Sequence, residues 1–192
     1  MCSSQKKGKL IIVSGPSGSG KTTIVKYLLS CNLNLLFSIS ACSRQKRKNE
    51  QDGIDYYFLS VDEFKLKIQQ GYFLEWEEVY QDNFYGTLKS EVLNKINVGH
   101  NLIFDVDVVG AKSLKNMFKD QALSIFIQAP SVKLISQRLV ARQTESDSQI
   151  AFRLDKAQHE EKAKKFFDYI LINDKLSIAK KTVLQKVQYF LN

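Results

Sequence analysis

A glycine-rich segment that ends in a lysine and a threonine is the strongest chemical pattern in the sequence. It runs Gly15-Pro16-Ser17-Gly18-Ser19-Gly20-Lys21-Thr22 and directly follows the apolar run Leu10-Ile11-Ile12-Val13. Because glycines have no Cβ, successive backbone N–H groups can converge on oxygen atoms, and a helix that begins near Lys21 adds the positive end of its dipole. We therefore expect a loop that binds a polyphosphate, with Lys21 at the β- and γ-phosphates and the Thr22 hydroxyl on Mg²⁺. The alternative is an ordinary glycine-rich turn with a chance lysine.

A second group of anion-binding side chains lies between residues 38 and 87. Arg44 and Arg47 are three positions apart, so their guanidinium groups can converge on one phosphate through bidentate hydrogen bonds. Tyr56 and Tyr85 add phenolic donors for a phosphate and aromatic walls for a base. The alternative is a basic loop in solvent, and the phosphate-binding loop upstream favours the binding role.

Three arginines and two aspartates extend the pattern toward the carboxyl terminus. Arg138, Arg142 and Arg153 are spaced so that a closing segment can bring them to a phosphoryl group in transfer. Arg138 and Arg142 are also i and i+4 neighbours, which is equally typical of a solvated helix face. Asp105 and Asp107 end a predicted strand at the edge where open α/β sheets bind ligands, and either can support Mg²⁺, directly or through water.

The elements that must hold these residues alternate between strands and helices. Short, almost wholly apolar runs predict strands that are buried on both faces, and amphipathic stretches predict the helices between them. Ser60 and Glu63 form a capping box, and Gly71 and Gly99 stand where helices end. Right-handed crossovers then give a doubly wound α/β fold with a five-stranded parallel sheet flanked by helices. The predicted strands are 10–14, 35–40, 102–106, 123–127 and 169–172, and the predicted helices are 21–30, 61–70, 90–98, 132–142, 148–164 and 178–190.

Length and composition indicate one compact unit. A chain of 192 residues is the size of a single domain. Its cysteines (Cys2, Cys31 and Cys42) are odd in number and lack metal-site spacing, so we expect neither a disulfide framework nor a zinc site. No apolar stretch indicates a leader or a membrane span, and we expect a cytoplasmic protein without a membrane partner. The net charge of +8 favours anionic ligands, although charge alone does not separate nucleotides from nucleic acid.

The order of these motifs resembles that of the guanylate kinases, P-loop enzymes that transfer the γ-phosphate of ATP to GMP. The resemblance covers nearly the whole chain. The matching segments are the phosphate-binding loop, Ser38-Ile39-Ser40, Arg44-Gln45-Lys46-Arg47, Gly53 to Tyr56, Phe73-Leu74-Glu75-Trp76, Phe84-Tyr85-Gly86-Thr87, Phe104-Asp105-Val106-Asp107, Phe126 to Ser131, Arg138-Leu139, Arg142, Arg153-Leu154 and Asn173-Asp174.

The resemblance implies three parts with separate tasks in a single domain. A P-loop kinase core (about 1–37, 88–137 and 165–192) would hold ATP and Mg²⁺, an inserted mixed α/β segment (about 38–87) would bind GMP, and residues of about 138–164 would form a helical lid. The implied catalytic residues are Lys21, Arg44, Arg138, Arg142 and Arg153. The implied GMP contacts are Ser40, Arg44, Arg47, Tyr56 and Tyr85 for the phosphate and Glu75, Thr87 and Asp107 for the base.

The chemistry of guanine supports the implied role of Glu75. Guanine presents N1–H and an exocyclic amine side by side, and one carboxylate can accept a hydrogen bond from each, whereas adenine has no such pair of donors. A base that leaves a buried carboxylate unpaired is rejected by several kcal/mol. The alternative is that Glu75 only ends a strand beside Trp76 and points to water.

Two other functions remain as alternatives to the kinase, and a few residues depart from the pattern of the family. The alternatives are a noncatalytic guanylate-kinase-like module for phosphorylated peptides and a P-loop kinase for another small phosphorylated substrate. The intact loop disfavours the first, and Glu75, Tyr85 and Asp107 disfavour the second. Lys46, Asn49 and Gln143 stand where the family has proline or glycine, which affects loop rigidity and lid hinging. We expect no nucleic-acid partner, and either a monomer or a homodimer.

Overall fold

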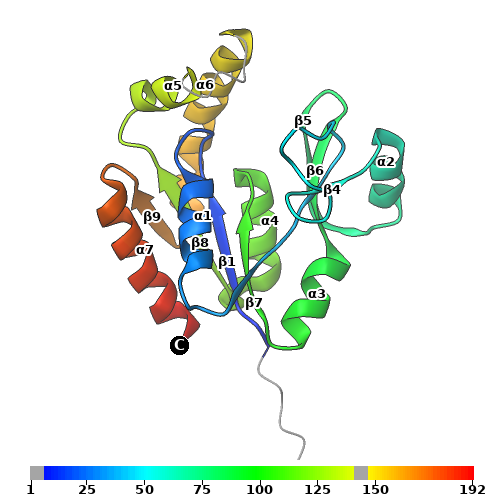
Figure 1. Ribbon diagram of the computed structural model, residues 1–192, viewed down its shortest axis with the longest axis horizontal. Coiled ribbons are helices and arrows are strands. Elements are labelled where there is room, and N and C mark those ends of the chain that lie inside the picture. Colours follow the sequence, from blue (N-terminus) through cyan, green and yellow to red (C-terminus); the bar gives the residue numbers. More distant parts are fainter. Residues whose placement is uncertain (1–6, 141–146) are drawn as a thin grey trace, which may run out of the picture.

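The computed structural model describes residues 7–140 and 147–192 and contains two β-sheets (Figure 1). The larger sheet has five strands in the order β2-β7-β1-β8-β9, and all neighbouring strands are parallel. The predicted five-stranded parallel sheet is therefore confirmed. Its strands are β1 (Leu10–Ser14), β2 (Leu35–Phe37), β7 (Asn101–Asp105), β8 (Ala122–Gln128) and β9 (Tyr169–Ile172).

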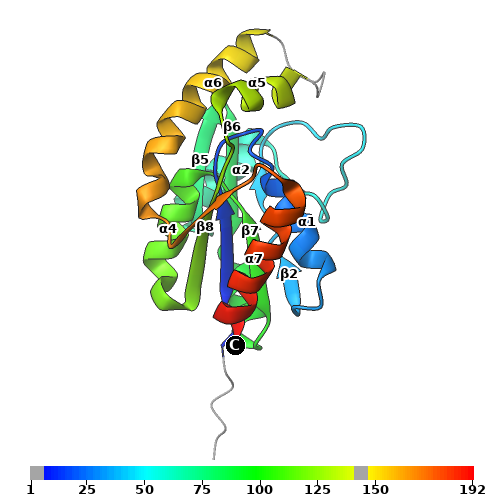
Figure 2. The ribbon, with the colours of Figure 1, turned by 90° about the vertical axis from the view of Figure 1, so that its left-hand side faces the viewer.

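Helices cover both faces of the larger sheet, as Figure 2 shows from the side. Helices α1 (Lys21–Ser30) and α7 (Leu176–Leu191) lie on one face, and α3 (Lys89–Asn97) and α4 (Val108–Phe118) lie on the other. Alternate residues of β1 point to opposite faces, so Val13 packs with the first pair of helices and Ile12 with the second. Both side chains are fully buried, which explains why this strand is apolar throughout.

The smaller sheet lies beside the larger one in Figure 1 and has the order β4-β3-β6-β5. It is mixed, because β3 pairs with β4 in parallel and with β6 antiparallel. Helix α2 (Val61–Gln69) covers it through Phe64, whose ring centroid lies 4.4 Å from that of Phe73 and 5.5 Å from that of Phe84. The strands are β3 (Ala41–Cys42), β4 (Tyr57–Phe58), β5 (Phe73–Tyr80) and β6 (Asn83–Leu88).

Two helices near the carboxyl-terminal edge of the larger sheet complete the fold (Figures 1 and 2). They are α5 (Val132–Val140) and α6 (Asp147–Lys162), which pack together through Ile135 and Ala157. Short 3₁₀ turns cover Lys119–Gln121 and Ala163–Phe166. None of the described helices has both the length and the apolar composition that crossing a bilayer requires. The division of the chain into core, insertion and lid stays a prediction.

Helix α4 is the α-helix that was not predicted from the sequence. It begins at Asp107, whose Oδ1 accepts a hydrogen bond from the backbone N–H of Gly110 at 2.8 Å. Glycine is unfavourable in a helix, so Gly110 obscures the helical pattern. The tertiary structure accounts for the glycine, because a Cβ at position 110 would lie 2.6 Å from Glu75 Oε2.

Other differences from the predicted elements lie at their ends and in the smaller sheet. The strand predicted over 35–40 ends at Phe37, where the chain leaves the larger sheet, and the helix predicted over 148–164 becomes 3₁₀ after Lys162. Residues 141 and 142 of the helix predicted over 132–142 lie outside the described residues. None of the four strands of the smaller sheet was among the predicted strands, although β5 and β6 have eight and six residues. Strands β3 and β4 have two residues each, which is too short to show an alternating pattern in the sequence. The capping box of Ser60 and Glu63 is confirmed.

We expect Phe64→Ala to lower the free energy of unfolding by about 3–5 kcal/mol, because it empties the centre of the small aromatic cluster under α2. Leu66→Ala on the same helix is the matched control, since Leu66 is 52% exposed, and should cost less than about 1 kcal/mol. Urea unfolding monitored by circular dichroism measures both variants. Equal losses would show that α2 does not hold the smaller sheet through Phe64.

Candidate active site

The predicted phosphate-binding loop connects β1 to α1 and leaves the start of the helix open. Helix α1 begins at Lys21 directly after Gly20, no side chain caps it, and its first turn carries no acidic residue. Lys21 Nζ donates hydrogen bonds back to the carbonyl oxygens of Gly15 (2.7 Å) and Pro16 (3.2 Å). Free N–H groups at a helix start and an ammonium beside them are the arrangement that binds phosphate oxygens.

Two glycines are required where the loop touches the rest of the protein. Gly15 has φ 134°, and a Cβ there would lie 2.4 Å from the carbonyl oxygen of Ile127. Gly20 has φ 101°, and a Cβ there would lie 2.3 Å from Asn173 Nδ2. The same amide of Asn173 donates to the carbonyl of Ser19 at 2.8 Å. The loop is thus held between β8 and the residue that follows β9.

Thr22 and Asp105 together provide oxygen atoms of the kind that Mg²⁺ prefers. Asp105 ends β7, and the parallel register places it opposite Val13 at the end of β1. The Thr22 hydroxyl donates to Asp105 Oδ2 at 3.0 Å. Over residues 7–140 and 147–192 no cluster of three or more acidic, His or Cys side chains could hold a metal ion alone. These two residues fit an ion whose other ligands are phosphate oxygens and water.

Two of the three predicted lid arginines reach the loop. Arg138 Nη1 donates to the carbonyl oxygens of Gly18 (3.2 Å) and Ser19 (3.3 Å). Arg153 Nη1 donates to Ser17 Oγ at 2.6 Å. Both guanidinium groups therefore bring positive charge to the place where a polyphosphate would lie. Arg142 lies outside the described residues.

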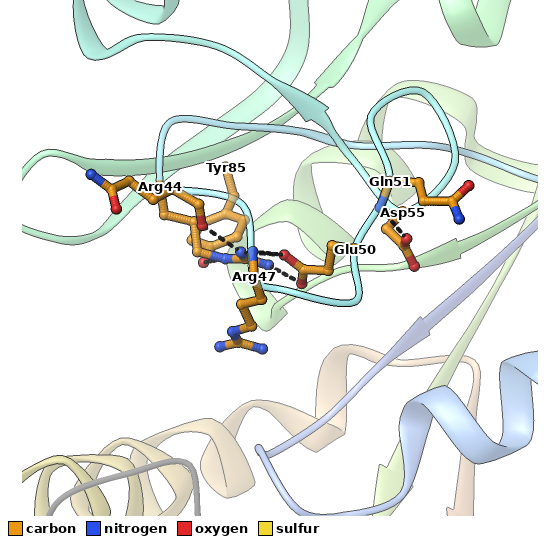
Figure 3. Close-up of polar contacts among 7 residues, drawn as sticks. Arg44, Arg47, Glu50, Gln51, Asp55 and Tyr85 are labelled. Atoms are coloured by element: carbon orange, nitrogen blue, oxygen red, sulfur yellow. Dashed lines mark hydrogen bonds and ion pairs between the residues drawn. The ribbon is translucent and has the colours of Figure 1, made fainter.

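Arg44 pairs with a carboxylate in its own loop, residues 43–50, which we call the basic loop. No role was predicted for this carboxylate from the sequence. Figure 3 shows the guanidinium of Arg44 paired with Glu50, at 2.7 Å from Nη1 to Oε2 and 2.6 Å from Nη2 to Oε1. Its Nε donates to the hydroxyl of Tyr85 at 3.1 Å, and Nη1 also donates to the carbonyl of Gln45. These contacts use four of the five N–H groups of a guanidinium, so Arg44 keeps one N–H for another acceptor.

Arg47 differs from Arg44 in the direction of its side chain. Its backbone N–H donates to Glu50 Oε2 at 2.9 Å, so one carboxylate positions both arginines. The guanidinium is directed away from the Arg44–Glu50 pair in Figure 3 and contacts none of the described residues by a hydrogen bond or an ion pair. Arg47 therefore offers a complete guanidinium to a ligand.

Two tyrosines flank the guanidinium of Arg44. The ring of Tyr56 lies 5.0 Å from its Cζ and meets the ring of Tyr85 edge-on at 6.0 Å between centroids. Burial raises the pKa of Tyr56 to about 12 and also raises the pKa of Tyr85. Both phenols therefore keep their protons at neutral pH and can donate hydrogen bonds to an anion.

Glu75 points into the protein and not to water. Its Oε1 accepts a 2.5 Å hydrogen bond from the hydroxyl of Thr87, which is fully buried, and alternation along β5 leaves Trp76 exposed instead. Burial raises the pKa of Glu75 to about 7, and the negative charge of Asp107 adds to this shift while the hydrogen bonds from Thr87 oppose it. The solvent-facing alternative for Glu75 is therefore wrong.

One cavity of about 340 Å³ joins these features. Thr87 lies behind Glu75, and Arg138 contacts the loop without lining the cavity. The predicted residues that line it are Gly15, Ser17, Lys21, Thr22, Ser40, Arg44, Arg47, Tyr56, Glu75, Tyr85, Asp105, Asp107 and Arg153. Residues from distant parts of the sequence thus share one space, with cationic groups and phenols near the loop and carboxylates farther along β5.

Comparison with known proteins assigns the chain to a family. The model of the guanylate kinase family matches residues 7–190. The chain belongs to the guanylate kinase family. The guanylate kinase of Bacteroides thetaiotaomicron is 47% identical over 188 residues, covering 98% of this chain and 92% of its own length. That of Porphyromonas gingivalis is 47% identical over 184 residues, covering 95% and 98%.

A solved structure supports the family at the level of the fold. The crystal structure of guanylate kinase from Anaplasma phagocytophilum has a TM-score of 0.79 and 26% sequence identity, covering 97% of this chain and 88% of that one. The sequence resemblance is thereby confirmed. Within this family member, Glu50, Gly110 and Asn173 are structural supports of the site to which the sequence analysis gave no role. The sequence held a signal for Glu50, an acid three residues after an arginine, and for Asn173, which belongs to a segment that matches the family.

We expect Glu50→Gln to lower the free energy of unfolding by about 1–3 kcal/mol at neutral pH, because it breaks a charge-assisted pair. Hydrogen bonding to Arg44 lowers the pKa of Glu50 from 4.5 to about 2. A carboxylate with a lowered pKa stabilises the fold above the unfolded pKa of 4.5, and this contribution disappears as the pH falls through 2. Urea unfolding between about pH 3 and pH 7 should therefore show a difference from wild type that shrinks with acidification.

Glu161→Gln is the control for this measurement. Glu161 pairs with Lys164 only three residues away on a partly exposed helix face, and its loss should cost less than about 0.5 kcal/mol. A loss for Glu50→Gln no larger than this value would contradict a structural role for Glu50.

Proposed function

We propose that this protein is a magnesium-dependent guanylate kinase that transfers the γ-phosphate of ATP to GMP and releases ADP and GDP. One observation carries the proposal: a single cavity joins an uncapped glycine-loop helix with its lysine to an arginine pair and a buried, hydroxyl-bonded carboxylate. The first half suits a nucleoside triphosphate, and the second suits a purine monophosphate with donors on its base.

ATP is assigned to the loop of residues 15–22. Backbone N–H groups at the start of α1 bind the β-phosphate, and Lys21 leaves the carbonyls of Gly15 and Pro16 to bind the β- and γ-phosphates. Thr22 and Asp105, which share a hydrogen bond, are the residues that would hold Mg²⁺. When bound there, Mg²⁺ would supply positive charge that offsets the negative charge of the phosphates.

The phosphate of GMP is assigned to the basic loop and its tyrosines. Arg47 supplies a complete guanidinium, and Arg44 supplies its remaining N–H while Glu50 holds it in place. Ser40, Tyr56 and Tyr85 add neutral donors. The guanidinium of Arg47 can bind two phosphate oxygens in bidentate geometry, whereas Arg44, already bidentate with Glu50, is limited to a single hydrogen bond. The pairing with Glu50 limits the repulsion between the two arginines.

The base of GMP is assigned to Glu75, Thr87 and Asp107. Ionised Glu75 accepts hydrogen bonds from N1–H and the exocyclic amine, and Thr87 fixes the carboxylate from behind. Asp107 Oδ1 is occupied by the N–H of Gly110, and Oδ2 is buried without a hydrogen bond among the described residues, so it can accept a hydrogen bond from the base. Adenine would leave these oxygens without partners, and this mismatch disfavours AMP.

Transfer needs no covalent enzyme intermediate. An oxygen of the GMP phosphate attacks the γ-phosphorus of ATP, the bond to the β–γ bridging oxygen breaks, and the electron pair stays on ADP. Lys21, Arg138 and Arg153 offset the charge that spreads over the transferring group, and Arg142 is assigned to the same task by family pattern. Positioning and charge neutralisation therefore account for the catalysis.

The catalytic interpretation is favoured over a noncatalytic phosphopeptide-binding module, because the loop, its lysine and the Thr22–Asp105 pair are complete. The cytoplasmic location, the absence of nucleic-acid and membrane partners and the choice between monomer and homodimer stay predictions from the sequence.

A coupled assay of ADP release with GMP, AMP, CMP, UMP and dTMP tests the proposal. We expect rapid turnover with GMP only. Lys21→Ala should reduce kcat by about 100-fold or more with the fold intact, because the transition-state charge loses its ammonium. Circular dichroism and urea unfolding verify the fold of the variant. No GDP from wild-type protein with Mg²⁺ would refute the function, and near-normal turnover by folded Lys21→Ala would refute the mechanism.

Glu75→Gln should raise the KM for GMP by about tenfold or more and leave the KM for ATP nearly unchanged, because an NH₂ donor replaces one of the two acceptor oxygens that face the base. In the wild type GMP needs the ionised carboxylate, whose pKa is about 7. The apparent affinity for GMP should therefore fall as the pH drops below 7, and Glu75→Gln should lack this part of the dependence. Comparing the two proteins at each pH removes the titration of GMP itself. Equal changes in both KM values would contradict the assignment.

A further inference from the structure

Lys156 lines the cavity and connects three elements of the fold. It belongs to α6, and its Nζ lies 3.5 Å from Oε1 of Glu77 on β5 and 3.8 Å from Oδ2 of Asp107 at the start of α4. These contacts join the helix of the predicted lid to both β-sheet regions. The sequence analysis gave no role to Lys156 or to Glu77.

The two carboxylates that face Lys156 have few other partners. Glu77 Oε2 and Asp107 Oδ2 are buried, and neither forms a hydrogen bond with the described residues. Because strand residues alternate, Glu77 lies on the same face of β5 as Glu75. Both line the cavity together with Asp107, and the carboxylates of Asp105 and Glu160 line it as well. A cation beside them offsets their mutual repulsion.

The helix that carries Lys156 also brings an acidic group to the cavity. Glu160 follows Lys156 by one helical turn and lines the same space. Burial raises the pKa of Glu160, and the charges of Lys21 and Lys156 oppose this shift. Arg153, also on α6, contacts Ser17 of the loop. Lys156 thus pairs with Glu77 of β5 and with Asp107 at the start of α4.

We propose that Lys156 is a positioning residue that couples α6 to the base-binding side of the cavity, so that GMP binding and closure of this helix support each other. The inference rests on the proposed function, since it assigns GMP to the cavity. Lys156 acts through Glu77 and Asp107, and it does not enter the transfer step.

The distances support a coupling that strengthens on closure. A charge-assisted hydrogen bond between an ammonium and a carboxylate is about 2.7–2.9 Å long, so both separations leave room for approach. A small inward movement of α6 shortens both pairs. The side chains involved are only 24–28% exposed, and solvent therefore screens the attraction less than at an open surface. GMP gains affinity because its site and the closed position of α6 are favoured together.

Steady-state kinetics of Lys156→Met tests the coupling. Methionine keeps the length of the apolar stem and removes the charge. The KM for GMP should rise by about three- to tenfold while the KM for ATP changes by less than about twofold, as expected for the loss of one partly buried ion pair. Lys156→Arg should restore most of the affinity for GMP. Lys162→Met, an exposed lysine at the end of the same helix, is the matched control and should behave as wild type.

A second-site variant separates coupling from a general structural effect. Lys156→Met leaves Glu77 and Asp107 facing each other without their cation. Adding Glu77→Gln removes one of the two charges, so the double variant should bind GMP better than Lys156→Met alone. Equal rises in both KM values, an unchanged KM for GMP, or a double variant weaker than Lys156→Met would each overturn the proposal.

These outcomes are distinguishable from failure of the proposed function. Wild-type protein that forms no GDP refutes the function, whereas active wild-type protein with an unaffected Lys156→Met variant refutes the inference alone. Thermal unfolding accompanies each assay. Should Lys156→Met not fold, Lys156→Gln replaces it with the same expected and contrary results, because glutamine also removes the charge and retains solubility.

Discussion

The contact between the glycine loop and the ends of β8 and β9 is the constraint on which the rest of the site depends. Gly15 lies against the carbonyl of Ile127, and Gly20 lies against the amide of Asn173, at distances that exclude any side chain. This approach lets α1 begin without a capping side chain at the carboxyl edge of the sheet. One space then contains the helix start, Lys21 and the Thr22–Asp105 pair. Arg138 of α5 and Arg153 of α6 contact the same loop. A larger residue at either glycine would displace all of these groups at once.

Charge is separated along the cavity in a way that suits two anionic nucleotides with different needs. The phosphate side gathers cations, and Glu50 pairs with one of them so that the arginines can lie close together. The base side gathers carboxylates, of which Glu75 is buried deeply enough to raise its pKa to about 7. Lys156 supplies the countercharge there. The net charge of +8 therefore says little about the site, because the local arrangement of both signs determines what each end can bind.

Much of the fold followed from local patterns. The continuous apolar runs predicted the parallel strands, the serine and glutamate of the capping box predicted the start of α2, and the glycine loop predicted the turn into α1. The misses have definite causes. Helix α4 contains Gly110 because the carboxylate of Glu75 occupies the space of a Cβ, and this contact joins residues far apart in the chain. Strands β3 and β4 are two residues long and depend on partners elsewhere in the chain, because β3 pairs with β6 and β4 pairs with β3.

For the site, the sequence by itself determined the chemical types: a phosphate loop, an arginine pair, phenols, and carboxylates near the end of a strand. Motif spacing suffices for this, because local backbone geometry forms a loop or a helix start. Only the tertiary structure decided which groups act together. It placed Asp105 beside Thr22, turned Glu75 inward against Thr87, paired Arg44 with Glu50 while Arg47 stayed directed away, and brought Lys156 to Glu77 and Asp107. Apart from the pair of Arg44 and Glu50 within one loop, these pairings depend on the packing of the two sheets and the helix pair, and a contact between residues distant in the chain leaves no periodic pattern in the sequence.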